Sequence, residues 1–543
     1  MLHLFNLLEN EFDAPGCLDI LMAIWENDRW CDFEAFEKTA RYCADTMHKM
    51  GLAEVEMLPL KADGETIYGD WQMPRAWDAN AATLTFADGR VLADYLQTPT
   101  SLVMYSAPTP TDGLRAQVVD ADNISDETDL REKILLTAKT AGAIVPLAQR
   151  AGAVGIISDL IPLFKNVRDN PMDLQGHSRW DGTFCIPKNE TGLFAFNLSP
   201  ENGKLLREEM QAGDVFVHAM VDAAFRDGVN YVVSGAILGE TDEEVLAYGH
   251  LYEPGALDNA SGCAVLLALA GCLNRCITDG KLPKPRRTLR FVVGWECIGS
   301  TAWLLAHPQR VGNTVAGVVA DMVGSEAIDN TFLRIWHNPM SNYGFTDALV
   351  HELLAAHRKH AGGYPAEHIN FKLGTDNIIG DPYWGIPTIS FVTEPALSYH
   401  SSMDTPDRID PAILARCAVL VGAFFWECAQ MTCDEKARLD KIAEEKQIQL
   451  VKESDQLNCV VPKRIIPGSL TGASNPGADY TKWPLAWNTA LHIPLFWVDG
   501  KRSLEEVIRL ATAEQGKTDP GAYHAEMLEF FDFLAANGFI SVE

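Results

Sequence analysis

The spacing of hydrophobic residues changes along the chain and divides it into regions. Residues 14–51 carry apolar residues at helical spacing, as in CLDILMAIWE and FEAFEKTARYCADTMHKMG, and Gly51 marks the end of this region. Between residues 68 and 95 apolar and polar residues alternate around Asp88-Gly89. That pattern predicts a β-hairpin, so we expect an N-terminal helical part followed by strands.

Residues from about 95 to 230 have the pattern of a mixed, strand-rich unit. ILLT at 134–137 and VGIIS at 154–158 predict strands, with a helix through 148–151 between them, and GLFAFNLS and VFVHAMV predict two more strands. This stretch lacks a cluster of His, Asp or Glu residues that would indicate chemistry.

From about residue 235, predicted strands alternate with predicted helices. The strands are VLAYG (245–249), LRFVVG (289–294), VAGVVA (315–320) and PTISFV (387–392), and the first helix covers 260–276. This alternation predicts an α/β sheet, on which the N-terminal helices are expected to pack.

The last region begins near residue 435 with a charged helix, KARLDKIAEEKQIQL, followed by a Pro/Gly-rich stretch. Two further helices and a closing strand pair then resemble a winged-helix module. Few basic and many acidic residues surround these helices, so packing or oligomerisation is favoured over DNA reading. The resulting division is 1–80 (N-terminal helical part), 81–234 (insert), 235–434 (main α/β domain) and 435–543 (C-terminal domain).

Composition limits the function. A chain of 543 residues predicts two to four domains, and a net charge of -30 disfavours nucleic acid while it can attract a substrate's amine. The 12 cysteines form no CxxC pair, and Cys272 and Cys276 are expected in the core rather than in disulfides. The N-terminus does not resemble a signal peptide, and no apolar run of about 18 residues occurs. We expect a cytoplasmic protein that binds no membrane, and a homo-oligomer stays open.

Metal-binding residue types follow the predicted strands of the main domain. They are His250 after VLAYG, Asp258 at the next helix start, Glu296 after FVVGW, Asp321 after VAGVVA, and His400 in the loop after PTISFV. Ligand sites of open α/β sheets lie at the carboxyl ends of strands. Imidazole and carboxylate both bind zinc, and a shared carboxylate can hold two ions about 3.5 Å apart. Taken singly, each residue also fits a core histidine, a helix cap or a surface acid, but together they favour a metal site.

The segments PGALDNASG, DMVGS and YHSSMDT, in this order, resemble the co-catalytic zinc aminopeptidases, which are related to metallopeptidase family M28; the resemblance covers about residues 235–430. It implies a phosphorylase/hydrolase-like mixed sheet flanked by helices, and a zinc-dependent hydrolase of peptide or amide bonds. The specific activity that we expect is that of an aminopeptidase that uses a metal-bound water. It also implies that His250 and Asp321 hold one zinc, Asp258 bridges, His400 holds a second zinc, and Tyr399 stabilises the oxyanion.

The region 95–230 resembles the protease-associated insert of such enzymes, best in QRAGAVGIIS. Together with DWQMPRAW and the C-terminal region, it suggests a bacterial branch of aminopeptidase-like proteins with this insert and a C-terminal winged helix. We expect the insert to form a β-rich lobe over the cleft that limits access to short peptides.

Two positions depart from the family pattern. The family has a Glu-Glu pair in which the first glutamate is the general base and the second is a metal ligand. This chain has Glu296 alone at that place, and we favour the role of general base for it. An aspartate that orients the first histidine is replaced by Tyr252, with Glu253 beside it as a substitute. The number of zinc ions, one or two, therefore stays open. Two alternatives to the peptidase also stay open: a single-zinc cyclase-like enzyme and a binding protein on the same scaffold. The expected substrate is a peptide or a small amino-acyl compound.

Overall fold

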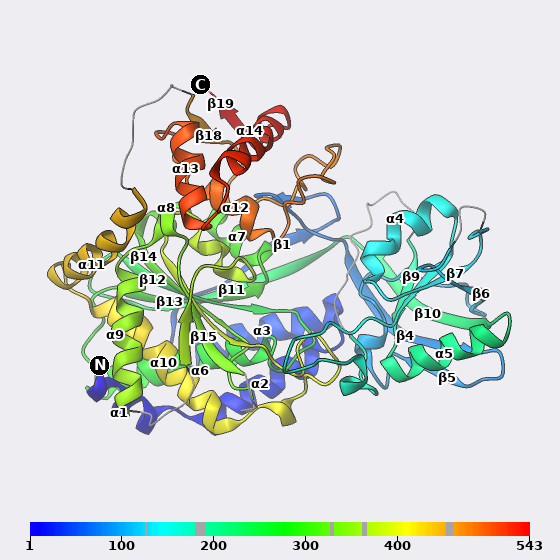
Figure 1. The fold of residues 1–543 in the computed structure, drawn as a ribbon. Coiled ribbons are helices and arrows are strands. Elements are labelled where there is room, and N and C mark those ends of the chain that lie inside the picture. The colour runs from blue at the N-terminus through cyan, green and yellow to red at the C-terminus, as the bar shows by residue number, and fades with distance from the viewer. Residues whose placement is uncertain (125–127, 180–191, 326–330, 361–365, 452–459, 543) are drawn as a thin grey trace.

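An eight-stranded mixed sheet forms the centre of the protein in the computed structural model, which describes residues 1–124, 128–179, 192–325, 331–360, 366–451 and 460–542 (Figure 1). Its strands, in spatial order, are β1 (Ala53–Ala62), β11 (Gly228–Ile237), β13 (Thr288–Trp295), β12 (Glu244–Leu251), β14 (Thr314–Asp321), β17 (Thr388–Glu394), β15 (Phe332–Trp336) and β16 (Ala366–Ile369). Strands β13, β12, β14 and β17 are parallel neighbours. Their carboxyl ends therefore meet at one edge of the sheet, as the sequence pattern predicts.

Helices cover both faces of this sheet. One face carries α1 (Leu2–Glu11), α2 (Ala14–Asp28), α3 (Phe33–Lys49), α6 (Ala260–Thr278), α9 (Phe345–His360) and α10 (Pro411–Gln430), and the other carries α7 (Ile298–Ala306) and α8 (Pro308–Asn313) (Figure 1). The N-terminal helices pack on α6 and α10, as expected. Helices α6 and α10 are long and apolar enough to cross a membrane, but 83% and 78% of their most apolar windows are buried inside the protein.

A second sheet forms a separate lobe, at the right in Figure 1. Its seven strands, in spatial order, are β5 (Val91–Asp94), β4 (Ala76–Phe86), β10 (Phe216–Arg226), β6 (Leu114–Asp120), β7 (Ile134–Thr137), β8 (Gly155–Ser158) and β9 (Phe194–Asn197), with helices α4 (Ala141–Ala151) and α5 (Pro200–Ala212). The expected hairpin is β4 and β5, and Gly89 in its turn has a φ of +90°. The lobe begins with β4, a few residues before the start expected from the sequence. A two-stranded ribbon, β2 (Ile67–Tyr68) and β3 (Trp71–Gln72), precedes it.

The C-terminal region starts with α11 (Cys433–Val451), which packs along α9. Helices α12 (Thr489–Phe496), α13 (Leu504–Glu514) and α14 (Pro520–Ala536) then enclose a hydrophobic core of their own. Strands β18 (Pro462–Arg464) and β19 (Ile540–Val542) pair antiparallel, with β18 before the three helices and β19 after them, whereas the sequence predicted a strand pair that follows the helices. A buried ion pair between Arg464 and Asp381, at 2.5 Å, ties this unit to the main domain.

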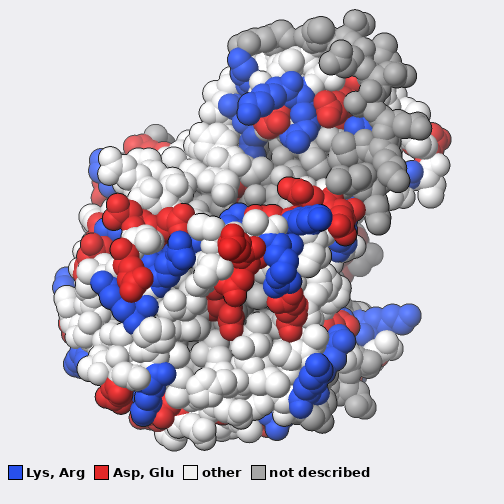
Figure 2. Space-filling view, turned by 90° about the vertical axis from the view of Figure 1, so that its left-hand side faces the viewer, with Lys and Arg blue, Asp and Glu red and all other residues white. Residues whose placement is uncertain are grey.

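Acidic and basic side chains lie side by side on the face that carries α9 and α11 (Figure 2). The pair Arg438–Glu352 joins these two helices at 2.7 Å, and Lys436–Asp440 at 2.6 Å lies within α11. Exposed pairs of this kind contribute little to stability, typically about 0.2–1 kcal/mol each. The described cysteines are free, and Cys272 and Cys276 are buried as expected; Cys185 and Cys459 lie outside the described residues.

Candidate metal centre

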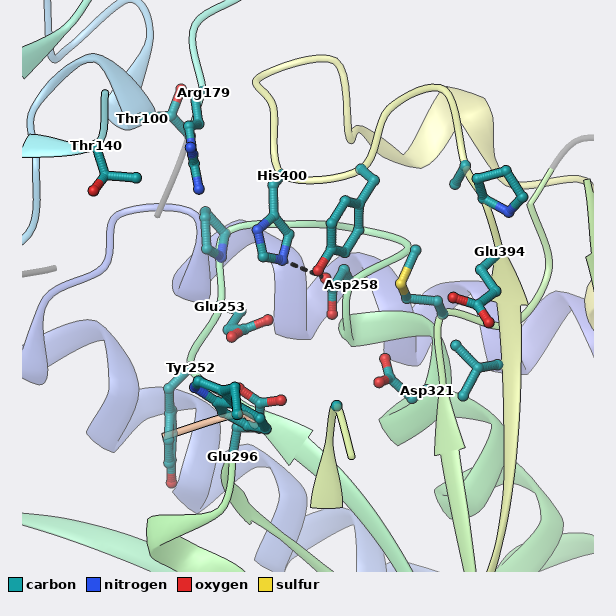
Figure 3. Close-up of a pocket in the computed structure, with 18 of the residues that line it drawn as sticks. Thr100, Thr140, Arg179, Tyr252, Glu253, Asp258, Glu296, Asp321, Glu394 and His400 are labelled. Atoms are coloured by element: carbon teal, nitrogen blue, oxygen red, sulfur yellow. Dashed lines mark ion pairs between the residues drawn. The ribbon is translucent and has the colours of Figure 1, made fainter. Parts of the chain in front are cut away.

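Two histidines and two aspartates meet at the carboxyl edge of the sheet: His250 in β12, Asp258 just before α6, Asp321 at the end of β14 and His400 in the loop after β17. Figure 3 shows Asp258, Asp321 and His400 of this group. His250 Nε2 lies 3.5 Å from Asp258 Oδ1 and 3.4 Å from Asp321 Oδ1. His400 Nε2 lies 3.2 Å from the other oxygen, Asp258 Oδ2. Each oxygen of the Asp258 carboxylate therefore faces a different histidine, which is the arrangement of a bridging ligand.

The start of α6 fixes the position of Asp258 relative to β14. The Asn259 side chain accepts a hydrogen bond from Gly262 N at 3.0 Å, which caps the helix, and another from Met322 N at 3.1 Å. Its amide nitrogen donates to Ala320 O at 3.1 Å. A Cβ on Gly262 would lie 2.1 Å from Ala320 O, so only glycine allows this approach. The sequence Asn-Ala-Ser-Gly thus binds the Asp258 loop to the strand that ends at Asp321.

Asp404, the aspartate of YHSSMDT, holds the same loop from the other side. Its carboxylate accepts hydrogen bonds from Leu257 N at 2.8 Å and Asp258 N at 3.0 Å, and it is 2% exposed. A Cβ on Gly255 would lie 2.2 Å from Asp404 Oδ2. The sequence pattern did not predict this role for Asp404. Its position in the motif YHSSMDT, which also contains His400, was the feature that could have indicated it.

Glu253 occupies the position from which an orienting carboxylate acts on His250. Glu253 Oε2 lies 3.5 Å from His250 Nδ1, on the side of the ring opposite Asp258 and Asp321. A metal-binding histidine usually directs its second nitrogen to a carboxylate or carbonyl, which fixes its tautomer. Tyr252, which precedes it, has a φ of +74°, and Asp28 of α2 accepts a hydrogen bond from Tyr252 N at 2.9 Å. The N-terminal helices therefore help to shape the loop that carries Glu253.

Glu296 lies at the end of β13, on the wall of the same cavity (Figure 3). Burial raises the pKa of its carboxyl to about 8, against the opposing effect of His250. Asp376 fixes the turn that follows, because it accepts hydrogen bonds from Cys297 N at 2.8 Å and Ser300 Oγ at 2.6 Å. Asp376 belongs to the segment GTDNIIG and had no role in the sequence analysis.

The unsatisfied atoms of this cluster fit a divalent cation. Both ring nitrogens of His250 and Asp321 Oδ1 are buried without a hydrogen-bond partner among the described residues. Burial raises the pKa values of Glu253 and Asp321, and both carboxylates also raise the pKa of His250 above its ordinary value, although burial alone would lower it. Two nitrogen or oxygen ligands of one tetrahedral ion, with bonds of about 2.0–2.2 Å, are roughly 3.3–3.5 Å apart. The spacings around Asp258 match this value, and a cation would compensate the excess of carboxylates.

Comparison with known proteins supports the same conclusion. Residues 232–425, which contain all of these ligand-type side chains, match the model of peptidase family M28. These residues are therefore similar to that peptidase family, and we call them the M28 region. The M28 region covers the sheet edge with His250, Asp258, Asp321 and His400, whereas the second lobe and the C-terminal unit lie outside the match.

Solved structures share the fold of most of this chain at low identity. A peptidase M28 precursor from Shewanella amazonensis is 19% identical, with a TM-score of 0.59 over 79% of this chain and 96% of that one. A zinc aminopeptidase from Bacillus subtilis is 19% identical, with a TM-score of 0.55 over 78% of this chain and 97% of that one. A Clostridium acetobutylicum protein with an aminopeptidase-like domain is 30% identical over 112 residues, which is 20% of this chain. The match spans about a quarter of that relative, 24% of its length.

Several parts of the chain outside the M28 region help to line its cavity, which has a volume of about 940 Å³. Trp71 comes from the β2–β3 ribbon, Thr140 and Arg179 from the second lobe, and Trp487 from the C-terminal unit. The rings of Trp71 and Trp487 are in contact, with centroids 5.4 Å apart. The second lobe thus lies on the metal side of the M28 region.

Arg168 links the second lobe to the segment that carries His400. Its side chain is fully buried, and Nη1 donates hydrogen bonds to Leu397 O at 3.0 Å and Tyr399 O at 3.1 Å. The guanidinium also lies over the Phe164 ring, 4.8 Å from its centroid. Burial lowers the pKa of Arg168 to about 10, which leaves it charged at neutral pH.

We call the group of metal-binding side chains in the M28 region the M28 centre. We expect Arg168→Ala to lower the stability of the fold and to weaken metal binding on the His400 side of this centre. Hydrogen bonds from a charged donor contribute about 1.5–3 kcal/mol each, and their loss frees the Tyr399 backbone. Denaturant unfolding and metal titration measure the two effects. Arg131→Ala, which removes an exposed arginine of the same lobe, is the control. If Arg168→Ala matched the control in both assays, the lobe would have no part in shaping the centre.

Proposed function

We propose that the protein is a zinc-dependent hydrolase of peptide or amide bonds, most specifically an aminopeptidase for short substrates. The observation that carries the proposal is the Asp258 carboxylate, whose two oxygens face His250 and His400 separately. A bridging carboxylate between two histidines fits a pair of ions. On this basis His250, Asp258 and Asp321 would hold one zinc, and Asp258 and His400 would contribute to a second.

Bound zinc would supply Lewis acidity, which lowers the pKa of a water molecule and polarises the substrate carbonyl. The protein's own residues carry the protons. Glu296 takes a proton from the attacking water and passes it to the leaving amine, a role that its place on the cavity wall allows. Tyr399 lines the cavity, and burial raises the pKa of its hydroxyl, so it stays protonated and can donate a hydrogen bond to the developing oxyanion.

The cavity favours a short substrate with a free amine. Its floor carries the carboxylates of Glu253, Asp258, Glu296 and Asp321, which attract an ammonium group. Its rim consists of the second lobe and Trp487, which leave a space suited to a small ligand rather than to an extended chain. The substrate's amino end therefore lies at the metal centre, and the remainder points toward the lobe.

The test compares amino-acyl p-nitroanilides with their N-acetylated forms. We expect hydrolysis of the free-amine substrates and little of the acetylated ones, with activity lost on chelation and restored by zinc. Equal rates on both forms would contradict the aminopeptidase assignment but leave amide hydrolysis standing. Metal binding without any hydrolysis of a broad substrate panel would favour a binding protein, and one bound ion per chain would favour a single-zinc enzyme.

A further inference from the structure

Three histidines form a second group of metal-binding side chains outside the cavity. His337 follows β15, His368 lies on β16, and His351 lies on α9, so three elements bring them together. The parallel pairing of β15 with β16 places Ile335 opposite His368, and His337 two residues on lies on the same face. None of the three lines the cavity of the M28 centre.

The ring centroids of these histidines are spaced like those of three imidazoles on one ion. Their ring centroids lie 5.0 Å apart for His337 and His368, 5.4 Å for His337 and His351, and 4.6 Å for His351 and His368. Imidazoles that bind one tetrahedral ion through nitrogens about 2.0–2.1 Å from it have centroids about 5 Å apart. His337 Nε2 and His368 Nδ1 are 3.1 Å apart, close to the roughly 3.3 Å between two such nitrogens.

A buried carboxylate prepares His337 for this role. Asp347, which is 0% exposed, accepts a hydrogen bond from His337 Nδ1 at 2.8 Å and is itself fixed by Asn338 N and Gly344 N, both at 2.9 Å. The Nδ1 proton therefore points at Asp347, and the lone pair of the neutral ring lies on Nε2, toward His368. A carboxylate behind a histidine is the common support of a metal ligand.

The other two rings can adapt to an ion. His351 and His368 are exposed, so the His351 ring can rotate to direct a nitrogen at the centre of the group. Desolvation and the neighbouring imidazoles lower the pKa of His368 to about 4, and the same two causes lower the pKa of His351. Neutral imidazoles are the form that binds metal.

We propose that His337, His351 and His368 bind one divalent transition-metal ion, of which zinc is the representative, at a site separate from the M28 centre. The ion replaces the hydrogen bond between His337 and His368, and the proton on His368 Nδ1 moves to His368 Nε2 by exchange with solvent, so that the ring stays a neutral ligand. It joins α9 to the edge of the sheet, and water completes the coordination. The site is independent of the proposed peptidase activity.

The experiment counts zinc ions per chain after the full-length protein is equilibrated with free zinc. We expect His351→Ala and His368→Ala each to bind one ion fewer than the wild type, with hydrolytic activity unchanged. His524→Ala, at an exposed histidine of α14, is the matched control and should keep every ion. The protein with His250→Ala should lose ions of the M28 centre and retain this one, which separates the two sites.

The same zinc should raise the thermal unfolding temperature of the wild type more than that of His368→Ala, because an ion bound only by the folded state stabilises it. Wild-type zinc content in both His351→Ala and His368→Ala would overturn the proposal. Equal loss of zinc in the His524→Ala control would also overturn it, since the ions would then be adventitious at surface histidines.

Discussion

Replacing Glu296 by glutamine should lower the rate of hydrolysis by about 10²–10⁴-fold and leave metal content unchanged. General acid–base catalysis contributes this factor, and glutamine cannot accept a proton. Glu296 directly follows β13 on the cavity wall, and burial raises the pKa of its carboxyl to about 8, so it holds a proton more readily than a surface glutamate. Elemental analysis and the rate on a confirmed amino-acyl substrate are measured on the same preparation.

Glu444→Gln, at an exposed position of α11, serves as the control for this substitution. A fall in metal content in Glu296→Gln would instead identify Glu296 as a metal ligand. That is the role of the second glutamate in the family's Glu-Glu pair. Unchanged metal together with an unchanged rate would remove Glu296 from the mechanism.

His250→Ala and His400→Ala should each lower both metal content and activity. A bound metal contributes several kcal/mol to transition-state stabilisation, which corresponds to a rate loss of about 10²–10³-fold or more. The two variants should differ, since His250 lies between Asp258 and Asp321 whereas His400 contacts the other oxygen of Asp258. We expect each to lose a different ion, and the double variant to lose both.

Metal titration by calorimetry distinguishes the two losses, with His48→Ala, an exposed histidine of α3, as the control. Far-UV circular dichroism shows whether each variant keeps its fold. Full occupancy in both single variants would show that the ligand set around Asp258 is wrong.

The sequence predicted the elements of the M28 region because local spacing determines them. Apolar runs bounded by polar residues gave β12, β13, β14 and β17, and helical spacing gave α6 between the first two. Parallel strands place their carboxyl ends at one edge, so the positions of His250, Asp258, Glu296, Asp321 and His400 after these strands were enough to predict a common site. The resemblance to the zinc aminopeptidases added their individual roles, which remain predictions.

The sequence alone did not predict the residues that position the ligands. Asp404 supports the Asp258 loop across 146 residues of chain, and Asp376 supports the turn after Glu296 across 79. Buried acids of this kind look like ordinary loop aspartates, because their hydrogen bonds exist only once two distant loops are packed together. Glu253 was named as a substitute from its position next to Tyr252, but its distance from His250 Nδ1 depends on the backbone turn at Tyr252.

By itself, the sequence determined which side chains end the strands of the M28 region, since strand period and helix capping depend on neighbours in the chain. Only the tertiary structure decided which distant segments face those ends. It placed the second lobe beside the candidate metal centre through Arg168, put Trp487 in the cavity wall, and brought His351 of α9 against His337 and His368. Such contacts depend on how layers pack across the sheet, and packing is set by the complementary shapes of whole surfaces, which no local pattern of residues specifies.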